Sequence, residues 1–154
     1  MMSRACNDYW RWAVVALAVL VMGCDSGPKR VPVSGRVLID GQPLKTGTVM
    51  VAPADERAAF GQIDSEGRFT LTTEKEGDGC VAGSHRATVT ATEILNPNET
   101  RLLVPPRYMD LSASALTVTI EGPTEDLLIE LSWEGGHPQT IRTESAGDID
   151  PNAM

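Results

Sequence analysis

The chain has few of the residues that most often carry chemistry. It holds three cysteines and two histidines among 154 residues, and only seven aromatic rings of the Trp, Tyr and Phe types. Nucleophilic catalysis needs a Ser or Cys beside a His and an orienting acid, and zinc sites need clustered Cys or His ligands. Cys80 and His85 are close in sequence but have no second pair, and His137 stands alone before Pro138. We therefore expect no enzyme, cofactor or metal site.

Basic residues are also scarce. Thirteen Lys and Arg oppose 21 Asp and Glu, so the formal net charge is −8, and no cluster of basic residues interrupts the acidic chain. A net negative protein repels phosphate backbones, and this composition argues against nucleic-acid binding.

No uncharged hydrophobic run is long enough to span a bilayer. The longest, from Trp12 to Gly23, would reach only about 18 Å as a helix, whereas the hydrocarbon core is about 30 Å thick. Arg4 and Arg11 precede this run, and the small residue Gly23 ends it. A charged start, a short apolar run and a small residue are typical of a secretory signal peptide, which we expect at residues 1–23.

The end of this segment, Val21-Met22-Gly23-Cys24, resembles the lipobox of bacterial lipoproteins. The resemblance implies cleavage after Gly23 and attachment of acyl chains of the palmitate type at Cys24. Two or three such chains would hold the protein at the cell membrane or outer membrane, on the extracytoplasmic side. Residues 24–30 would then form a short tether. Ordinary cleavage with an unmodified Cys24, or an uncleaved anchor, are the alternatives.

The remaining cysteine has no partner for a disulfide. Cys6 would leave with the signal peptide and Cys24 would carry lipid, so Cys80 would stand alone. Nothing near Cys80 in the sequence lowers its pKa, and we expect a small loop or core residue rather than a nucleophile.

Period-two alternation of apolar and polar residues predicts an all-β domain over residues 31–134. The expected strands are seven: 31–40, 47–53, 60–64, 68–73, 84–93, 116–120 and 127–131. Their expected inward residues include Val33, Val37, Ile39, Phe69, Leu71, Ala87, Val89 and Ala91. Turn residues suggest that 47–53 pairs with 31–40, and that 116–120 pairs with 127–131.

The connecting segments differ in character. Residues 65–67 read as a tight turn in which Gly67 supplies a positive φ. Segment 74–83 reads as a loop, and 94–114 as a long irregular segment broken by prolines. Residues 135–154 are polar, acidic and without periodicity, which predicts a disordered tail.

Three stretches in order resemble one known family. Residues 33–44 (VSGRVLIDGQPL) resemble the opening strand and turn of carboxypeptidase regulatory-like (transthyretin-like) domains, and residues 64–69 (DSEGRF) resemble their acidic-x-x-Gly-x-Phe hairpin. Residues 83–89 resemble their Pro-Gly-x-Tyr-x-x-x-Val strand, although Ala82 replaces the Pro and His85 replaces the Tyr.

A further stretch, VPPRY at 104–108 followed by LTV at 116–118, looks like small bacterial lipoproteins that carry this domain alone. The likeness covers residues 31–132. It implies a seven-stranded antiparallel Greek-key β-sandwich that serves as an accessory or structural module rather than an enzyme.

These observations favour a non-enzymatic envelope lipoprotein that acts as a structural or protein-interaction module, with envelope proteins or glycans as partners. The alternative is a carbohydrate or small-ligand binding module that uses loops 74–83 and 94–114. Threonine-rich strand faces could offer hydroxyls to a glycan, although solvated strand faces usually have this composition. These threonines are Thr70, Thr72, Thr88, Thr90, Thr92, Thr117 and Thr119. An enzyme of unrecognised type is a third reading.

Overall fold

Short strands that alternate buried and exposed residues make up most of the structure, a computed structural model that describes residues 28–142. The predicted signal peptide, Cys24 and residues 143–154 lie outside the described part. The strands number thirteen there, joined by one short 3-10 helix, so the predicted all-β class is confirmed. In chain order they are β1 (Arg30–Val31), β2 (Val33–Ile39), β3 (Gln42–Pro43), β4 (Gly47–Ala52), β5 (Ala59–Ile63), β6 (Arg68–Thr70), β7 (Cys80–Val81), β8 (Gly83–Thr90), β9 (Thr92–Asn96), β10 (Glu99–Leu102), η2 (Pro106–Tyr108), β11 (Thr117–Ile120), β12 (Thr124–Leu131) and β13 (Gln139–Arg142).

One four-stranded sheet has the order β11-β8-β4-β5 and is antiparallel throughout. Val49 of β4 lies opposite Val89 of β8, and both side chains are fully buried. β-Branched residues fill this inner face because they pack well on a pleated surface. The predicted inward positions Ala87, Val89 and Ala91 are confirmed, since each is at most 1% exposed.

The second sheet is built around β2. Strand β12 lies along one edge of β2 in parallel, while β3 and β6 pair with its other edge in antiparallel fashion. The parallel pair differs from the wholly antiparallel sheet that the family resemblance implies. Residues 40–123 lie between β2 and β12, which gives the chain ample length for the crossover that parallel strands require.

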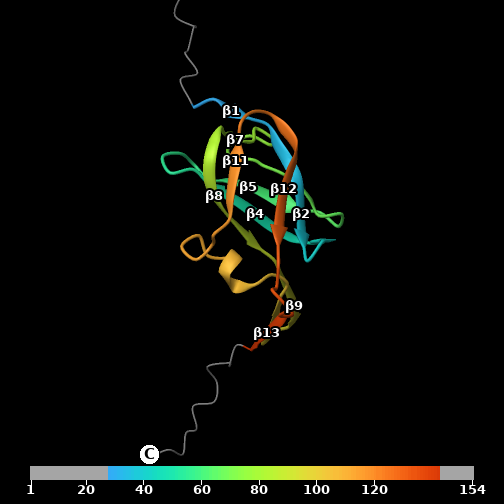
Figure 1. Ribbon diagram of the computed structural model, residues 1–154. Coiled ribbons are helices and arrows are strands. Elements are labelled where there is room, and N and C mark those ends of the chain that lie inside the picture. The colour runs from blue at the N-terminus through green and yellow to red at the C-terminus, as the bar shows by residue number, and fades with distance from the viewer. Residues whose placement is uncertain (1–27, 143–154) are drawn as a thin grey trace, which may run out of the picture.

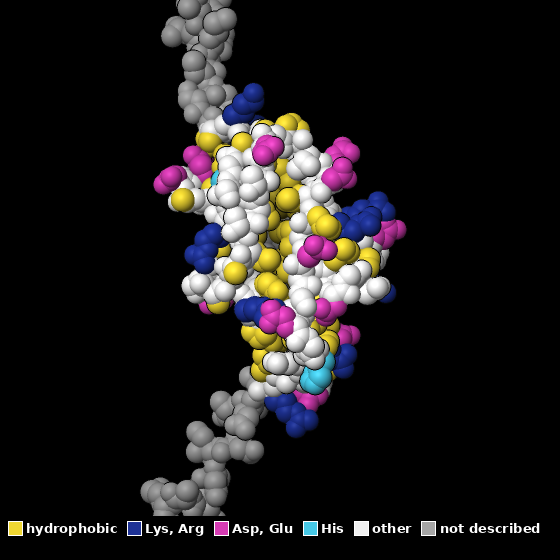
Figure 2. Space-filling model, in the orientation of Figure 1, with side chains coloured by type: hydrophobic (Ala, Val, Ile, Leu, Met, Phe, Trp, Pro, Cys, Tyr) yellow, Lys and Arg dark blue, Asp and Glu magenta, His cyan; other side chains and the backbone are white. Residues whose placement is uncertain are grey.

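The two sheets enclose one hydrophobic core to which both contribute (Figure 1). Val33 and Val37 of β2 are buried as predicted, and Ile39 packs partly buried against them. Phe69 and Leu71 point inward as predicted and are 3% and 0% exposed. Hydrophobic side chains remain visible along the middle of the face shown in Figure 2, between β11 and β12.

Two smaller sheets lie at opposite ends of the molecule (Figure 1). At one end, β1 pairs with β7, and the chain begins its described course. At the other end, β9, β10 and β13 form a three-stranded antiparallel sheet that we call the tip sheet. No helix in residues 28–142 combines the length and hydropathy needed to cross a membrane.

Two predicted strand pairings are wrong. β4 pairs with β5 and β8 rather than with β2, because residues 44–46 carry the chain across to the other sheet. Leu44 in this crossing segment is buried in the core. β11 pairs with β8 and β12 pairs with β2, so the turn at 121–124 also joins two sheets rather than two neighbours.

Three segments predicted to lack regular structure contain strands. Residues 92–102 form the hairpin β9–β10, in which Asn96-Pro97-Asn98 is the turn and not the start of an irregular segment. The side-chain oxygen of Asn96 accepts the Asn98 N–H at 3.0 Å, a turn that Asn favours. In the predicted tail, residues 139–142 form β13, which is stabilised by pairing with β10. Part of the predicted 74–83 loop likewise forms β7.

Candidate functional site

Cys80 and His85, which the sequence analysis considered for catalysis and metal binding, lie in surroundings that fit a structural role. Cys80 is 1% exposed, and burial raises the pKa of its thiol, which makes it a poor nucleophile. The Nε2 atom of His85 lies 2.9 Å from the carbonyl oxygen of Val81, and its ring packs over Gly83. Within residues 28–142, no group of three or more His, Cys, Asp or Glu residues is placed to hold a metal ion.

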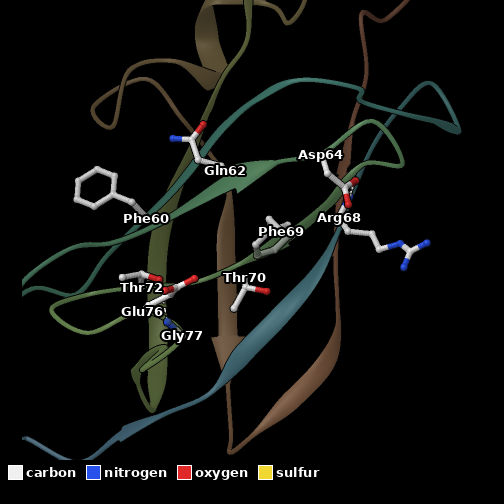
Figure 3. A pocket seen from close by; sticks show the side chains of 9 residues that line it. All are labelled: Phe60, Gln62, Asp64, Arg68, Phe69, Thr70, Thr72, Glu76 and Gly77. Atoms are coloured by element: carbon white, nitrogen blue, oxygen red, sulfur yellow. Dashed lines mark hydrogen bonds between the residues drawn. The ribbon is translucent and has the colours of Figure 1, made fainter.

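One pocket lies on the hairpin that joins the two main sheets. Its volume is about 700 Å³. Strand β5 belongs to one sheet and β6 to the other, and the connecting turn is the one predicted at 65–67. Figure 3 shows the lining side chains, which come from both strands and the following loop: Phe60, Gln62, Asp64, Arg68, Phe69, Thr70, Thr72, Glu76 and Gly77.

The turn of this hairpin is held by one aspartate. The Oδ1 atom of Asp64 accepts the backbone N–H groups of Glu66 and Arg68 at 2.8 and 2.9 Å. Gly67 has φ +79°, as predicted, and its position leaves no room for a side chain beside the Val37 carbonyl oxygen. The turn therefore fixes the relative position of the two strands that line the pocket.

A second pocket, of about 630 Å³, adjoins the start of the described chain. Two nitrogens of the Arg30 guanidinium contact the Glu74 carboxylate at 3.2 Å, and Nη1 also lies 3.6 Å from Asp78. The Arg30 side chain is only 19% exposed, so this double contact is better shielded from water than an ordinary surface ion pair. It fastens β1 to the loop before β7.

Asp78 organises the same loop. Its Oδ1 atom accepts the Thr73 N–H at 2.7 Å, and its carboxylate also accepts the N–H of Glu74. Desolvation alone would raise the pKa of Asp78, but these hydrogen bonds and the nearby Arg30 outweigh it and hold the pKa below its usual value. The ionised carboxylate is thus part of the folded loop.

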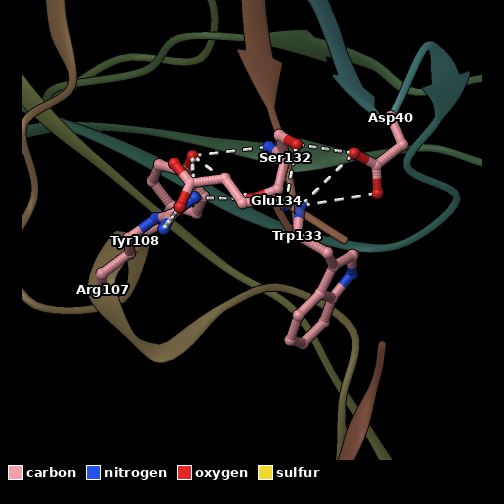
Figure 4. A network of polar contacts seen from close by, with 6 residues as sticks. All are labelled: Asp40, Arg107, Tyr108, Ser132, Trp133 and Glu134. Carbon is pink, nitrogen blue, oxygen red and sulfur yellow. Dashed lines mark hydrogen bonds and ion pairs between the residues drawn. The ribbon is translucent and has the colours of Figure 1, made fainter. Parts of the chain in front are cut away.

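A polar network joins the end of β12 to the 3-10 helix and to the end of β2 (Figure 4). The guanidinium of Arg107 donates to the carboxylate of Glu134 at 2.8 Å and to the Ser132 carbonyl oxygen at 2.7 Å. It also contacts Tyr108, through the phenol oxygen at 3.0 Å and over the ring at 4.7 Å from the centroid.

Asp40 completes this network from the opposite side. Its carboxylate accepts the Ser132 hydroxyl at 2.8 Å and the Trp133 N–H at 3.3 Å. Within the described residues, no histidine takes part in the hydrogen bonds of Ser132 and Asp40, so these bonds supply no base for the serine. Because residues 132–134 lead towards β13, the network instead holds the chain that enters the tip sheet.

The tip sheet has two unlike faces. Ile94 and Ile141 both lie opposite Thr100 in the register, so all three side chains share one face. Ile94 is 78% exposed and Ile141 50% exposed. On the other face, charged residues pair with one another, as in the contacts Arg101–Glu93 at 3.1 Å and Arg142–Glu99 at 2.6 Å.

No protein-family model, no curated protein and no solved structure matches this chain. The resemblance to carboxypeptidase regulatory-like domains therefore stays a prediction, as does lipidation of Cys24. Of the threonines expected on solvated strand faces, Thr70 and Thr72 line the larger pocket, whereas Thr88 is buried. The sequence analysis singled out neither Phe60 nor the residues of the tip sheet. An aromatic residue at an outward strand position was the one available clue.

Proposed function

We propose that this protein is a non-enzymatic, lipid-anchored lipoprotein of the cell envelope that acts as a structural or protein-interaction module. The lipobox-like sequence ending at Cys24 supports the anchor. The observation that carries the interaction role is the placement of β1 and the tip sheet at opposite ends of the molecule (Figure 1). A body anchored by its amino-terminal end would direct the tip sheet away from the membrane.

The tether supports this orientation because it is short. Residues 25–29 alone separate Cys24 from β1, and five extended residues reach about 17 Å. β1 itself is fixed to the body by its pairing with β7 and by the contacts of Arg30 with Glu74 and Asp78. The β1 end would therefore lie close to the membrane surface.

The tip sheet supports a protein partner with an uncharged, apolar surface. One of its faces carries the exposed side chains of Ile94 and Ile141, and exposed apolar groups gathered on one surface often mark interaction sites. The charges of the sheet lie on the opposite face and are paired within the sheet, so they do not call for a charged partner.

For the fold itself, we propose a carboxypeptidase regulatory-like (transthyretin-like) domain, whose central body is a seven-stranded Greek-key β-sandwich. The order of the three sequence motifs supports this, and a two-layer all-β body is compatible with it. The tip sheet and the β1–β7 pair would then be additions to that body.

Site-specific photo-crosslinking in native membranes tests the proposed role. A crosslinker at position 94 should give a defined adduct, whereas one at the control position 128 should not. Leu128 is a suitable control because it is 53% exposed but lies on β12, outside the tip sheet.

A matched pair of substitutions completes the test. Ile94→Asp should remove an adduct formed from position 141, and Leu128→Asp should leave it intact. Equal adducts from positions 94 and 128, or no effect of Ile94→Asp, would contradict the proposed interaction surface.

A further inference from the structure

The outer face of the β5–β6 hairpin arranges its side chains in cross-strand rows. Phe60 and Thr72 exchange both backbone hydrogen bonds, at 2.9 and 2.8 Å, and the Asp64 N–H donates to the Arg68 carbonyl oxygen at 2.9 Å. Side chains of directly opposite residues share a face of the hairpin. Phe60 is therefore beside Thr72 at one end of the pocket, and Asp64 beside Arg68 at the other.

The middle row follows from the same register. Gln62 and Thr70 lie between the two fixed pairs, and both are exposed and line the pocket. The face thus runs from an aromatic ring, through an amide and hydroxyls, to a carboxylate and a guanidinium (Figure 3). Glu76 and Gly77 close the side near Phe60 and Thr72.

The polar groups of this face are held by local hydrogen bonds. The Thr72 hydroxyl oxygen accepts the Gly77 N–H at 3.0 Å, which leaves its own proton to donate. The Gln62 side-chain oxygen accepts the Thr48 hydroxyl at 3.4 Å, which fixes the amide so that its NH₂ group can donate. Asp64 uses Oδ1 in the turn, and its Oδ2 can accept.

The aromatic ring supplies a flat apolar surface beside these donors and acceptors. Phe60 is 48% exposed on the outer face of β5, whereas Ala59 and Ile63 of the same strand are buried on the inner face. A pyranose ring has the complementary structure, with C–H groups on one face and hydroxyls around its rim. A phenyl face can pack against the C–H groups while amide, hydroxyl and carboxylate groups bind the rim.

Charge and size narrow the ligand class. Asp64 and Glu76 bring two carboxylates, while the guanidinium of Arg68 is already paired with Glu66. Phosphates, sulfates and uronic acids would meet repulsion here. The volume of about 700 Å³ lies within the usual range for small-molecule sites, and the exposed rows leave room for a chain that continues beyond one sugar.

We propose that the outer face of the β5–β6 hairpin binds an uncharged oligosaccharide, with Phe60 stacking under one pyranose ring. Gln62, Thr70 and Thr72 donate to sugar hydroxyls, and Asp64 and Glu76 accept from them. This surface lies on the body and not on the tip sheet, so the site is independent of the anchor and of the proposed protein partner. Of the two loops that the alternative hypothesis named for ligand binding, the site includes Glu76 and Gly77 of 74–83 and no residue of 94–114.

Titration of the ¹⁵N-labelled full-length protein with uncharged oligosaccharides at millimolar concentration tests the site. The probes are linear hexasaccharides of glucose, mannose, xylose and N-acetylglucosamine. At least one probe should shift the amide signals of residues 60–62, 70–72 and 77, while the tip-sheet amides stay unchanged. If no probe shifts the hairpin amides, or if the shifts centre on other residues, the proposal is overturned.

Substitutions of Phe60 distinguish a loss of ring stacking on the sugar from a loss of folding. Phe60→Ala should weaken binding about tenfold, whereas Phe60→Trp should retain it because the larger ring keeps the stacking surface. Leu128→Ala, which removes a similarly exposed apolar side chain from β12, should have no effect. Unchanged affinity in Phe60→Ala, with the hairpin amide signals still at their folded positions, would overturn the stacking role.

A cationic peptide is the competing ligand, since a ring between carboxylates also attracts ammonium groups. A lysine-rich decapeptide is therefore titrated under the same conditions. Hairpin shifts caused by the peptide, suppressed by salt and not reproduced by any sugar, would overturn the carbohydrate assignment. Sugar-induced shifts that persist at high salt would support it.

Discussion

The hydroxyl of Ser132 donates to the Oδ1 atom of Asp40 at 2.8 Å, which joins two residues 92 positions apart in the sequence. Asp40 directly follows β2 and Ser132 directly follows β12, so the bond closes the end of the one parallel strand pair in the described residues. The backbone N–H of Asp40 also donates to the Leu131 carbonyl oxygen at 2.9 Å. These contacts fix the point at which the chain leaves the body for the tip sheet.

Asp40→Ala should loosen this junction. Loss of the acceptor for Ser132 and Trp133 should lower the free energy of unfolding by about 1 kcal/mol, a modest amount because the site is solvent-exposed. Hydrogen exchange of the β13 amides should accelerate more than that of the β8 amides. Asp40→Asn is the control, because its side-chain oxygen can still accept hydrogen bonds. If Asp40→Asn loses as much stability as Asp40→Ala, the hydrogen bonds from Ser132 and Trp133 are not what stabilises the junction.

Two glycines with nearly the same backbone angle should respond differently to substitution. Gly41 has φ +78° and open space where a Cβ would lie, so Gly41→Ala should cost about 1 kcal/mol of backbone strain alone. Gly79 has φ +77°, but a Cβ there would overlap the Val31 carbonyl oxygen. Gly79→Ala should therefore cost clearly more and should release β1 from β7. Equal denaturant midpoints for the two variants would show that the backbone of Val31 does not approach Gly79 closely.

Asp78→Asn should make stability less dependent on acid pH. The folded-state pKa of Asp78 lies below that of the unfolded chain, so its carboxylate stabilises the fold at pH values above the unfolded value of about 4. That contribution is lost as the pH falls through the folded-state pKa. The variant should be less stable by about 1 kcal/mol at neutral pH, and the gap should narrow in acid. A gap that stays constant from pH 7 to about 2.5 would contradict the role of the ionised carboxylate.

The two phenylalanines offer a direct comparison of burial. Phe69 is 3% exposed in the core, so Phe69→Ala should lower the free energy of unfolding by about 3–4 kcal/mol. Phe60 is 48% exposed, and Phe60→Ala should cost less than about 1 kcal/mol. Urea denaturation of both variants measures the difference. Similar losses would show that Phe60 is part of the core and not a surface available to a ligand.

The sequence predicted individual strands well because their signal is local. Alternation placed Phe69, Leu71, Ala87 and Val89 on inner faces, and all four are buried. A period of two depends only on the pleat of each strand and needs no knowledge of its neighbour. The turn at Gly67 was predictable for the same reason, since its geometry demands a residue that tolerates positive φ.

Strand partners could not be predicted in this way. Pairing of β2 with β12 joins residues about 90 positions apart, and no short motif encodes such a contact. The prolines at 97 and 105–106 suggested a break, yet Pro97 lies in the turn of the β9–β10 hairpin. β13 has little apolar periodicity of its own and forms through its pairing with β10.

The candidate sites depend on those distant contacts. An antiparallel β-bridge pairs Phe60 with Thr72, and this pairing also sets which side chains of the hairpin point outward. On the tip sheet, Ile94 and Ile141 lie on different strands and share a face only because both pair with Thr100. The local sequence pattern could identify the outward threonines. Only the strand register of the hairpin shows which of them share a surface with the ring of Phe60.

The mass of the intact protein extracted from native membranes is a direct test of the proposed lipid anchor on Cys24. We expect a chain that begins at Cys24 and carries the added mass of two or three acyl chains, and we expect the Cys24→Ser variant to be released into the soluble fraction. A mass without lipid, or one that retains residues 1–23, would contradict the lipoprotein assignment.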